Sequence, residues 1–381
     1  MRSTLLPKLI CPNSKSTSFV LYAAELLRNG QTIENVDNES IMDSDDITSG
    51  YLIADQRFVY PIRYGVLSLL SDDDVDTKHF EEQIAHINQY SESWKELTEQ
   101  NVTRMKARQE SQGGSWNRAE MRYYDDEVDT EEKRESMCDN IRDQDLPHIF
   151  IPREKHILGL VKPSIKAKLL VEIGCGNART ITRMMPPNQY DYQYIGTDIS
   201  FYRLVVAKMA CPQGEFVQAS AFNLPFRDDI ADVGISFGML HHLPVPIEGV
   251  RDLNRVLKQK CELGIHEPIE TEKIVVGKHP RIEAALATYD HSERDGEIDL
   301  DAFSNELMRL GYRRSRQQLM GSPFRSAINV VLRKTIPSLL HNQAAVKLVF
   351  TIDRIFIATV CKAFSKLKPR SVVLYYERTN V

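Results

Sequence analysis

Two glycines separated by one residue follow an apolar run in residues 169–180, LLVEIGCGNART. The turn consists of Gly174, Cys175 and Gly176, and Glu172 precedes it. Glycine lets the backbone approach a ligand closely, and a helix that starts after such a turn offers free N–H groups. The same pattern describes a tight strand-to-helix turn without a ligand, so the turn alone does not decide between the two interpretations.

The residues around the turn favour a nucleoside over a pyrophosphate. Arg179 stands where the dinucleotide fingerprint G-x-G-x-x-G has its third glycine, and the Glu172 carboxylate would repel phosphates. Asp198, which follows the next apolar run, can accept both hydroxyls of a ribose. Its alternative role is to cap the helix that begins after it. Together the three residues favour a nucleoside that carries a positive charge.

The elements that must position these residues begin near residue 149. Short apolar runs at 168–174, 192–200, 231–238 and 261–268 alternate with segments of helical spacing at 178–185, 200–210 and 247–259. A capped helix at 299–311, a strand at 312–319 and a final strand at 371–378 follow. This alternation predicts an α/β fold with a parallel sheet covered by helices on both faces.

Four ordered motifs carry a resemblance to a known family: VEIGCGNART, YIGTDIS, ASAFNLPFRDDIADVGISFGMLHHLP and LNRVLKQKCELGIHEP. They resemble those of class I S-adenosylmethionine-dependent methyltransferases, of the type that acts on small molecules. The resemblance implies a Rossmann-like seven-stranded sheet, S-adenosylmethionine as cofactor, and methyl transfer by in-line displacement to a small-molecule, glycan or lipid-like acceptor. A biosynthetic role is implied with it.

The resemblance also implies a cofactor site. The methionine end would lie at Glu172, Gly174, Cys175 and Gly176, the ribose at Asp198, and the adenine at Ile199, Ser220 and Ala221, with Phe237 closing the site. Three positions depart from the family pattern. Ser220 replaces an aspartate, Ala178 replaces a glycine, and LKQKC replaces a glycine-containing turn.

A base is needed only if the methyl acceptor must lose a proton. His241, His242, Glu267 and His291 are the catalytic candidates. The alternative role of the two adjacent histidines is packing or capping, and that of Glu267 is capping of the next segment. His291 would alternatively lie in a solvated loop. Tyr123 and Tyr124 are candidates to close over the cofactor, with surface packing as the equal alternative.

The domain organisation that we predict has three parts. Residues 1–72 form a small β-rich unit that resembles the zinc-ribbon-like activator domain of some methyltransferases. Only Cys11 remains of that domain's four cysteines, so we expect no metal. An acidic run at 71–76 marks the boundary to a helical linker or cap, 73–148. The methyltransferase domain spans 149–381, with a lid at 269–300 and a helical insertion at 322–369.

The composition of the chain bears on its partners and its location. The 381 residues carry a net charge of −5, which disfavours nucleic acid as a partner, and six scattered cysteines favour a cytoplasmic protein. Asp353 and Arg354 interrupt the longest apolar stretch, which disfavours a transmembrane segment. Peripheral membrane contact and a homodimer remain compatible with the sequence. The alternative functions are an RNA methyltransferase and a non-catalytic scaffold that binds the cofactor.

Overall fold

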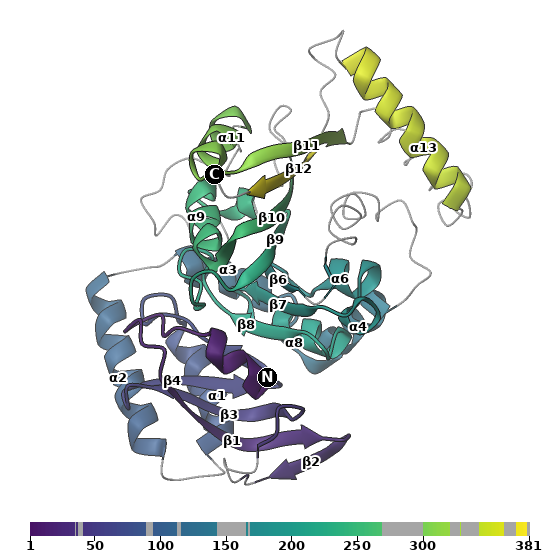
Figure 1. Ribbon diagram of the computed structural model, residues 1–381. Coiled ribbons are helices and arrows are strands. Elements are labelled where there is room, and N and C mark those ends of the chain that lie inside the picture. Colours follow the sequence, from purple (N-terminus) through teal and green to yellow (C-terminus); the bar gives the residue numbers. More distant parts are fainter. Residues whose placement is uncertain are drawn as a thin grey trace.

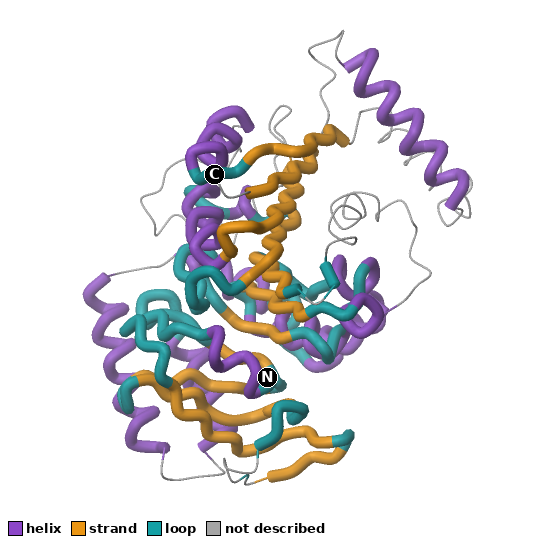
Figure 2. Tube along the Cα trace, in the orientation of Figure 1, coloured by secondary structure: helices purple, strands orange, loops and turns teal. Residues whose placement is uncertain are grey.

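The computed structural model describes residues 1–34, 36, 41–88, 94–112, 116–142, 165–166, 168–268, 300–320, 328, 343–361 and 371–378. Its strands form a 12-stranded sheet in the order β11-β12-β10-β9-β6-β7-β8-β5-β4-β3-β1-β2 (Figure 1). Helices lie on both faces of this sheet, as the tube view in Figure 2 shows. The α/β class predicted from the alternating apolar runs is confirmed.

Seven of these strands make up the predicted Rossmann-like sheet. Five of them are parallel: β6 (Leu169–Ile173), β7 (Gln193–Asp198), β8 (Glu215–Gln218), β9 (Ala231–Phe237) and β10 (Leu257–Pro268). At the edge, β12 (Ser371–Arg378) runs antiparallel to both of its neighbours, β10 and β11 (Arg313–Met320), so β11 has the same direction as β10. The strand β10 starts directly after its preceding helix, which therefore ends three residues before the predicted end at 259.

Side chains of β6 alternate between two hydrophobic core clusters, because successive residues of a strand point to opposite faces. Val171 packs into the cluster that holds Leu253 and Phe303, whereas Leu170 packs into the cluster that holds Ile181 and Leu204. The helices α9 (Pro246–Val256) and α11 (Leu300–Arg309) therefore cover one face. The helices α6 (Arg179–Met184) and α8 (Phe201–Ala210) cover the other.

The remaining elements of this part are short or peripheral. They are α7 (Pro187–Tyr190), the 3-10 helix η6 (Leu240–His242), α13 (Gln343–Phe356) and the π-helical turn η8 (Ile357–Cys361). The start of α8 follows from its sequence, because Ser200 caps it by accepting the N–H of Arg203 at 3.2 Å.

The N-terminal strands extend the same sheet. They are β1 (Phe19–Arg28), β2 (Gln31–Glu34), β3 (Asp46–Ala54), β4 (Phe58–Arg63) and β5 (Val66–Ser68), after the 3-10 helix η1 (Ser3–Lys8). Leu67 of β5 pairs in parallel with Val217 of β8, and Leu9 bridges to Phe226. The segment 1–72, predicted as a separate unit, thus shares its sheet and one core cluster with strands of the predicted domain 149–381.

Four helices follow within the predicted helical cap: α1 (Thr77–Asn88), α2 (Lys95–Gln112), α3 (Trp116–Asp125) and α4 (Glu131–Arg142). The acidic run 71–76, predicted as a boundary, holds two of these helices against the sheet. Its carboxylates pair with side chains of α2 and α3 as follows: Asp72 with Arg104, Asp73 with Arg108, Asp74 with Asn117, and Asp76 with Arg122.

Cys11, the remaining cysteine of the zinc-ribbon-like pattern, is fully buried with its Sγ 3.1 Å from the Tyr60 hydroxyl. Within the described ranges no group of three or more His, Cys, Asp and Glu side chains could hold a metal ion. No helix of those ranges is long and apolar enough to cross a membrane. His291 and the lid at 269–299 lie outside the described residues, and the insertion is described at 328 and 343–361.

Candidate cofactor and catalytic site

The glycine turn lies at the carboxyl end of β6, between the ends of β7 and β9. Gly174 and Gly176 have φ angles of +65° and +53°, which side chains disfavour. A Cβ atom on Gly174 would lie 2.0 Å from Cγ of Met239. Position 174 therefore requires glycine for its conformation and for space. A positive φ angle and the absence of a Cβ atom both allow the backbone of the turn to approach a ligand closely.

Asp198 holds this turn against the end of β7. Its Oδ2 accepts the N–H of Gly176 at 2.8 Å and its Oδ1 accepts the N–H of Ser200 at 2.9 Å. Burial raises the pKa of the Asp198 carboxyl above its ordinary value. Each carboxylate oxygen can accept a further hydrogen bond, so Asp198 can fix the turn and still receive hydroxyl groups. The helix cap itself is Ser200, not Asp198.

Glu172 lies beneath the turn with its side chain buried, and it accepts the hydroxyl of Tyr194 at 2.6 Å. Burial, together with the charge of Glu172, raises the pKa of Tyr194 well above its ordinary range, so its hydroxyl remains a donor. Burial likewise raises the pKa of the Cys175 thiol. A raised pKa disfavours the thiolate form of Cys175, which is the nucleophilic form.

The residues predicted near the adenine follow β7 and β8. Ser220 is buried, and its Oγ accepts Nδ2 of Asn117 at 3.1 Å and the N–H of Phe222 at 3.2 Å. The carbonyl of Ile199 accepts Nε2 of Gln218 at 2.9 Å. Asn117 lies on α3, so a helix from the predicted cap reaches the predicted cofactor site.

One face of α3 lies against the ends of these strands. Besides Asn117, Met121 places its Sδ 3.1 Å from Nε2 of Gln218. Asp125 accepts the Ser200 hydroxyl at 2.6 Å and the N–H of Tyr202 at 3.0 Å. Burial raises the pKa of the Asp125 carboxyl to about 7. The sequence analysis missed Asn117, Met121 and Asp125, although their spacing of four residues places them on one helix face.

Glu267 and His241 form a hydrogen-bonded pair beside the turn. Glu267 ends β10, is 1% exposed, and accepts the backbone N–H groups of Met239, Leu240 and His241 at 3.0–3.4 Å. Its Oε2 also lies 2.8 Å from Nδ1 of His241. A carboxylate only accepts hydrogen bonds, so Nδ1 carries the proton and Nε2 is the acceptor nitrogen. The sequence analysis predicted Glu267 and His241 as separate candidates, and the fold places their side chains within hydrogen-bonding distance.

His242 lies in a different environment. Burial, aided by the neighbouring His241 and Arg203, lowers the pKa of His242 to about 3. Its ring centroid is 4.0 Å from that of His241, and its Nε2 is 3.3 Å from the hydroxyl of Tyr124. An imidazole with this pKa stays neutral near pH 7 and is a poor proton acceptor. Of the two histidines, His241 has the geometry of a base.

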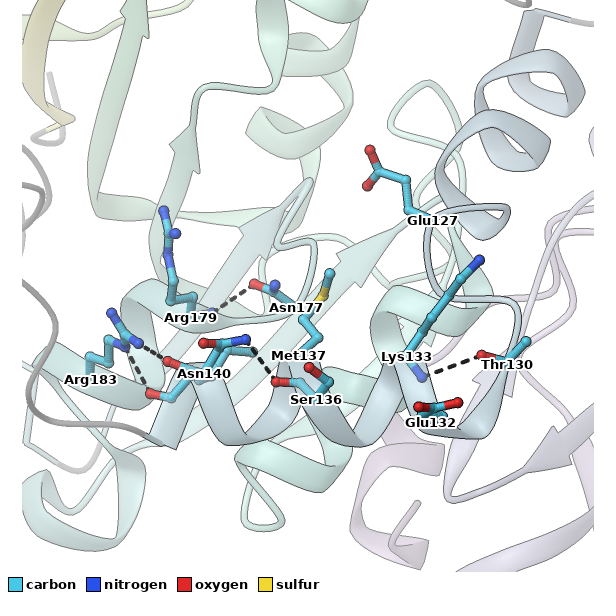
Figure 3. Close-up of a pocket in the computed structure, with 11 residues that line it drawn as sticks. Glu127, Thr130, Glu132, Lys133, Ser136, Met137, Asn140, Asn177, Arg179 and Arg183 are labelled. Carbon is cyan, nitrogen blue, oxygen red and sulfur yellow. Dashed lines mark hydrogen bonds between the residues drawn. The ribbon is translucent and has the colours of Figure 1, made fainter.

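The remaining predicted residues border the site. Phe237 ends β9 and packs against the core cluster that contains Cys175, and Ala221 lies directly after Ser220. A polar cavity of about 740 Å³ opens next to the turn, between α4 and α6 (Figure 3). Asn177 lines it next to the turn, Arg179 lines it from the start of α6, and Lys133 and Asn140 line it from α4. Polar side chains therefore lie beside the turn.

Comparisons with known proteins agree with this geometry. Residues 171–264 match a family model described as a methyltransferase domain. No curated protein sequence matches the chain. Similar solved structures include phosphoethanolamine N-methyltransferase 2 of Haemonchus contortus with S-adenosyl-L-methionine, at 12% identity and a TM-score of 0.43, covering 68% of this chain and 60% of that one.

A SAM-dependent methyltransferase from Aquifex aeolicus is 13% identical with a TM-score of 0.37, and 64% of this chain and 98% of that one are covered. The cyclase SpnF is 13% identical with a TM-score of 0.39, and the match covers 60% of this chain and 81% of that one. The reaction class is assigned from the family match. Residues 171–264 therefore form a methyltransferase domain.

Proposed function

We propose that this chain methylates a small-molecule, glycan or lipid-like acceptor at a hydroxyl or amine whose proton passes to His241. The Glu267–His241 pair carries the proposal. Glu267 accepts three backbone N–H groups as well as Nδ1 of His241, so the carboxylate and the imidazole are both fixed. An imidazole held in this way presents Nε2 as a proton acceptor.

The residues at the carboxyl ends of β6 and β7 fit the cofactor. Gly174 and Gly176 provide the close backbone approach, and Asp198 provides acceptors for the ribose hydroxyls. Ser220, bound by Asn117, borders the adenine side. S-adenosylmethionine supplies a methyl group already activated by a sulfonium, so the protein has to align the acceptor and exclude water.

The protein's own residues accept the proton and exclude water. The Nε2 atom of His241 takes the acceptor's proton, and the Glu267 carboxylate stabilises the imidazolium that results. The neutral ring of His242 packs against His241 and adds no competing charge. The α3 helix covers the strand ends and limits the access of water.

The acidic composition supports a small acceptor over RNA. Binding of nucleic acid is dominated by contacts between Lys or Arg and phosphates, and the chain carries a net charge of −5. A labelling experiment with a cell extract should nevertheless include the RNA fraction of that extract, because a methylated RNA would contradict this part of the proposal.

Titration calorimetry with S-adenosylmethionine and S-adenosylhomocysteine tests the cofactor site. We expect both to bind the full chain, and Asp198→Ala to weaken binding by about 1–3 kcal/mol because the ribose loses its acceptor. Asp232→Ala is the control for a general loss of charge, because Asp232 lies at the start of β6, at the opposite end of that strand. We expect this variant to bind both ligands as the unmodified chain does. Equal affinity of Asp198→Ala and the unmodified chain would refute the ribose contact.

Methyl transfer is tested by incubating the chain with methyl-tritiated S-adenosylmethionine and a cell extract. The extract is afterwards separated into polar metabolites, lipids and RNA. We expect label in the metabolite or lipid fraction, and His241→Gln to lower the rate about 10²–10⁴-fold with unchanged cofactor affinity. His86→Gln, on the distant helix α1, is the matched control. A His241→Gln variant with normal rate would exclude His241 as the base.

A further inference from the structure

One face of α13 exposes a row of large apolar side chains. Leu348 is 60% exposed, Ile352 37% and Ile355 59%. Their spacing of four and three residues places them on one side of the helix. Val349 and Asp353 are buried on a different side. Burial of the charged Asp353 next to exposed isoleucines is the reverse of what a helix facing only water would show.

Exposed arginines lie on α13 and on the strand that it contacts. Arg354 of α13 is exposed, and so are Arg313, Arg314 and Arg316 of the edge strand β11, which α13 contacts. In sequence, residues 321–370 contain nine Lys and Arg but a single acidic residue, Asp353, in a chain whose net charge is −5. The acidic residue of this segment is the one that is buried. The described exposed side chains of α13 therefore include the apolar row and the cation Arg354.

We propose that this face of α13 binds an anionic lipid surface, with Leu348, Ile352 and Ile355 inserted at the headgroup level. An amphipathic helix with an apolar row and flanking arginines is the pattern of an interfacial helix, and each cation near an anionic membrane adds to binding. No helix within the described part of the chain could span a bilayer, so the contact is with one leaflet. The proposal does not depend on methyl transfer.

Two other occupants fit the surface less well. A second copy of the chain, packed symmetrically on this face, would bring Arg354 and the β11 arginines close to their own counterparts. A nucleic acid would use the arginines but would leave the apolar row in water. In Figure 1, α13 lies beyond β11 at the edge of the sheet, where it can reach a flat surface.

Vesicle flotation of the full chain tests the proposal. The probes are vesicles of phosphatidylcholine alone and of phosphatidylcholine mixed equally with phosphatidylglycerol. We expect flotation with the mixed vesicles and release by high salt, since salt screens the arginines. The double variant Leu348→Glu, Ile355→Glu should weaken binding roughly tenfold or more. Arg354→Gln should weaken it about fivefold.

Val20→Glu is the matched control, because Val20 is 54% exposed on β1, near the opposite end of the sheet. It should float as the unmodified chain does, and thermal unfolding should be the same for all variants. Equal binding to both vesicle types, or unchanged binding of the double variant, would overturn the proposal. A lipid-independent dimer that the double variant dissociates would assign the face to a second copy and would also overturn it.

Discussion

Two buried or half-buried carboxylates at strand ends each accept backbone N–H groups from the loop beside them. Asp198 binds the glycine turn after β6, and Glu267 binds Met239 and the start of η6. Each carboxylate therefore fixes the backbone that lies next to it. Each can also act on a second group, a ribose hydroxyl for Asp198 and the His241 imidazole for Glu267.

The two glycines of the turn differ in the space around their Cα atoms, and a pair of alanine substitutions measures this difference. Alanine at either position adds the cost of a left-handed backbone, about 1–2 kcal/mol. At Gly174 the new Cβ also meets Met239, whereas at Gly176 it would lie 4.0 Å from Nη1 of Arg203. We expect Gly174→Ala to lower the free energy of unfolding by about 1–3 kcal/mol more than Gly176→Ala. Urea unfolding gives both values, and equal losses would contradict the clash.

At the scale of elements, α3 connects the N-terminal half of the chain to the site. Asp74 and Asp76 of the acidic run hold one side of α3, through Asn117 and Arg122. Its other contacts reach Ser220 and the first turn of α8. The acidic run, which its charge predicts as a domain boundary, therefore supports a helix over the proposed cofactor site.

Asp125 makes the junction between α3 and α8 dependent on pH. Its folded pKa is about 7, whereas an unfolded aspartate titrates near 3.9. Between these values the folded carboxyl keeps a proton that the unfolded chain releases. Its contribution to the free energy of unfolding therefore falls as pH rises from about 4 to about 7, and is constant above that range.

Asp125→Asn removes this dependence, because an amide oxygen can still accept from Ser200 and Tyr202. We expect the stability of the variant relative to the unmodified chain to increase by roughly 2 kcal/mol between about pH 5.5 and pH 8. Asp126→Asn, at the exposed neighbouring position, is the control. A difference that stays constant across this range in denaturant unfolding would show that Asp125 titrates as an ordinary aspartate.

At the scale of the whole molecule, the N-terminal strands and the methyltransferase domain form one continuous sheet. The junction is the short parallel pair of β5 and β8, supported by a core cluster that contains Leu5, Leu9, Val217 and Phe226. A shared core makes the two parts depend on each other for folding.

We therefore expect scanning calorimetry of the full chain to show a single transition for these parts. Phe226→Ala, which empties a fully buried site between them, should lower the free energy of unfolding by about 3–5 kcal/mol and shift that whole transition. Val245→Ala, at a 46% exposed position, is the control. Two separate transitions, of which Phe226→Ala moves only one, would show that the N-terminal part folds independently.

The elements that sequence analysis located best are those with strong periodicity. The runs of β6, β7, β9 and β10 are buried on both faces, and their apolar composition shows it directly. The strand β1 was not predicted, because its burial alternates irregularly around a bulge near Glu25. The end of α9 was predicted too late, because Leu257 continues the apolar pattern while already pairing with Ala231 of β9.

The sequence by itself determined the strand-to-helix order, the glycine turn and the carboxylate at the end of the second strand, because these depend on residues close together in the chain. Which side chains meet was decided only by the tertiary structure. Asn117 reaches Ser220, and Glu267 reaches His241, across 103 and 26 residues. Contacts of this kind depend on how strands and helices pack, and one sequence contains no local signal for them.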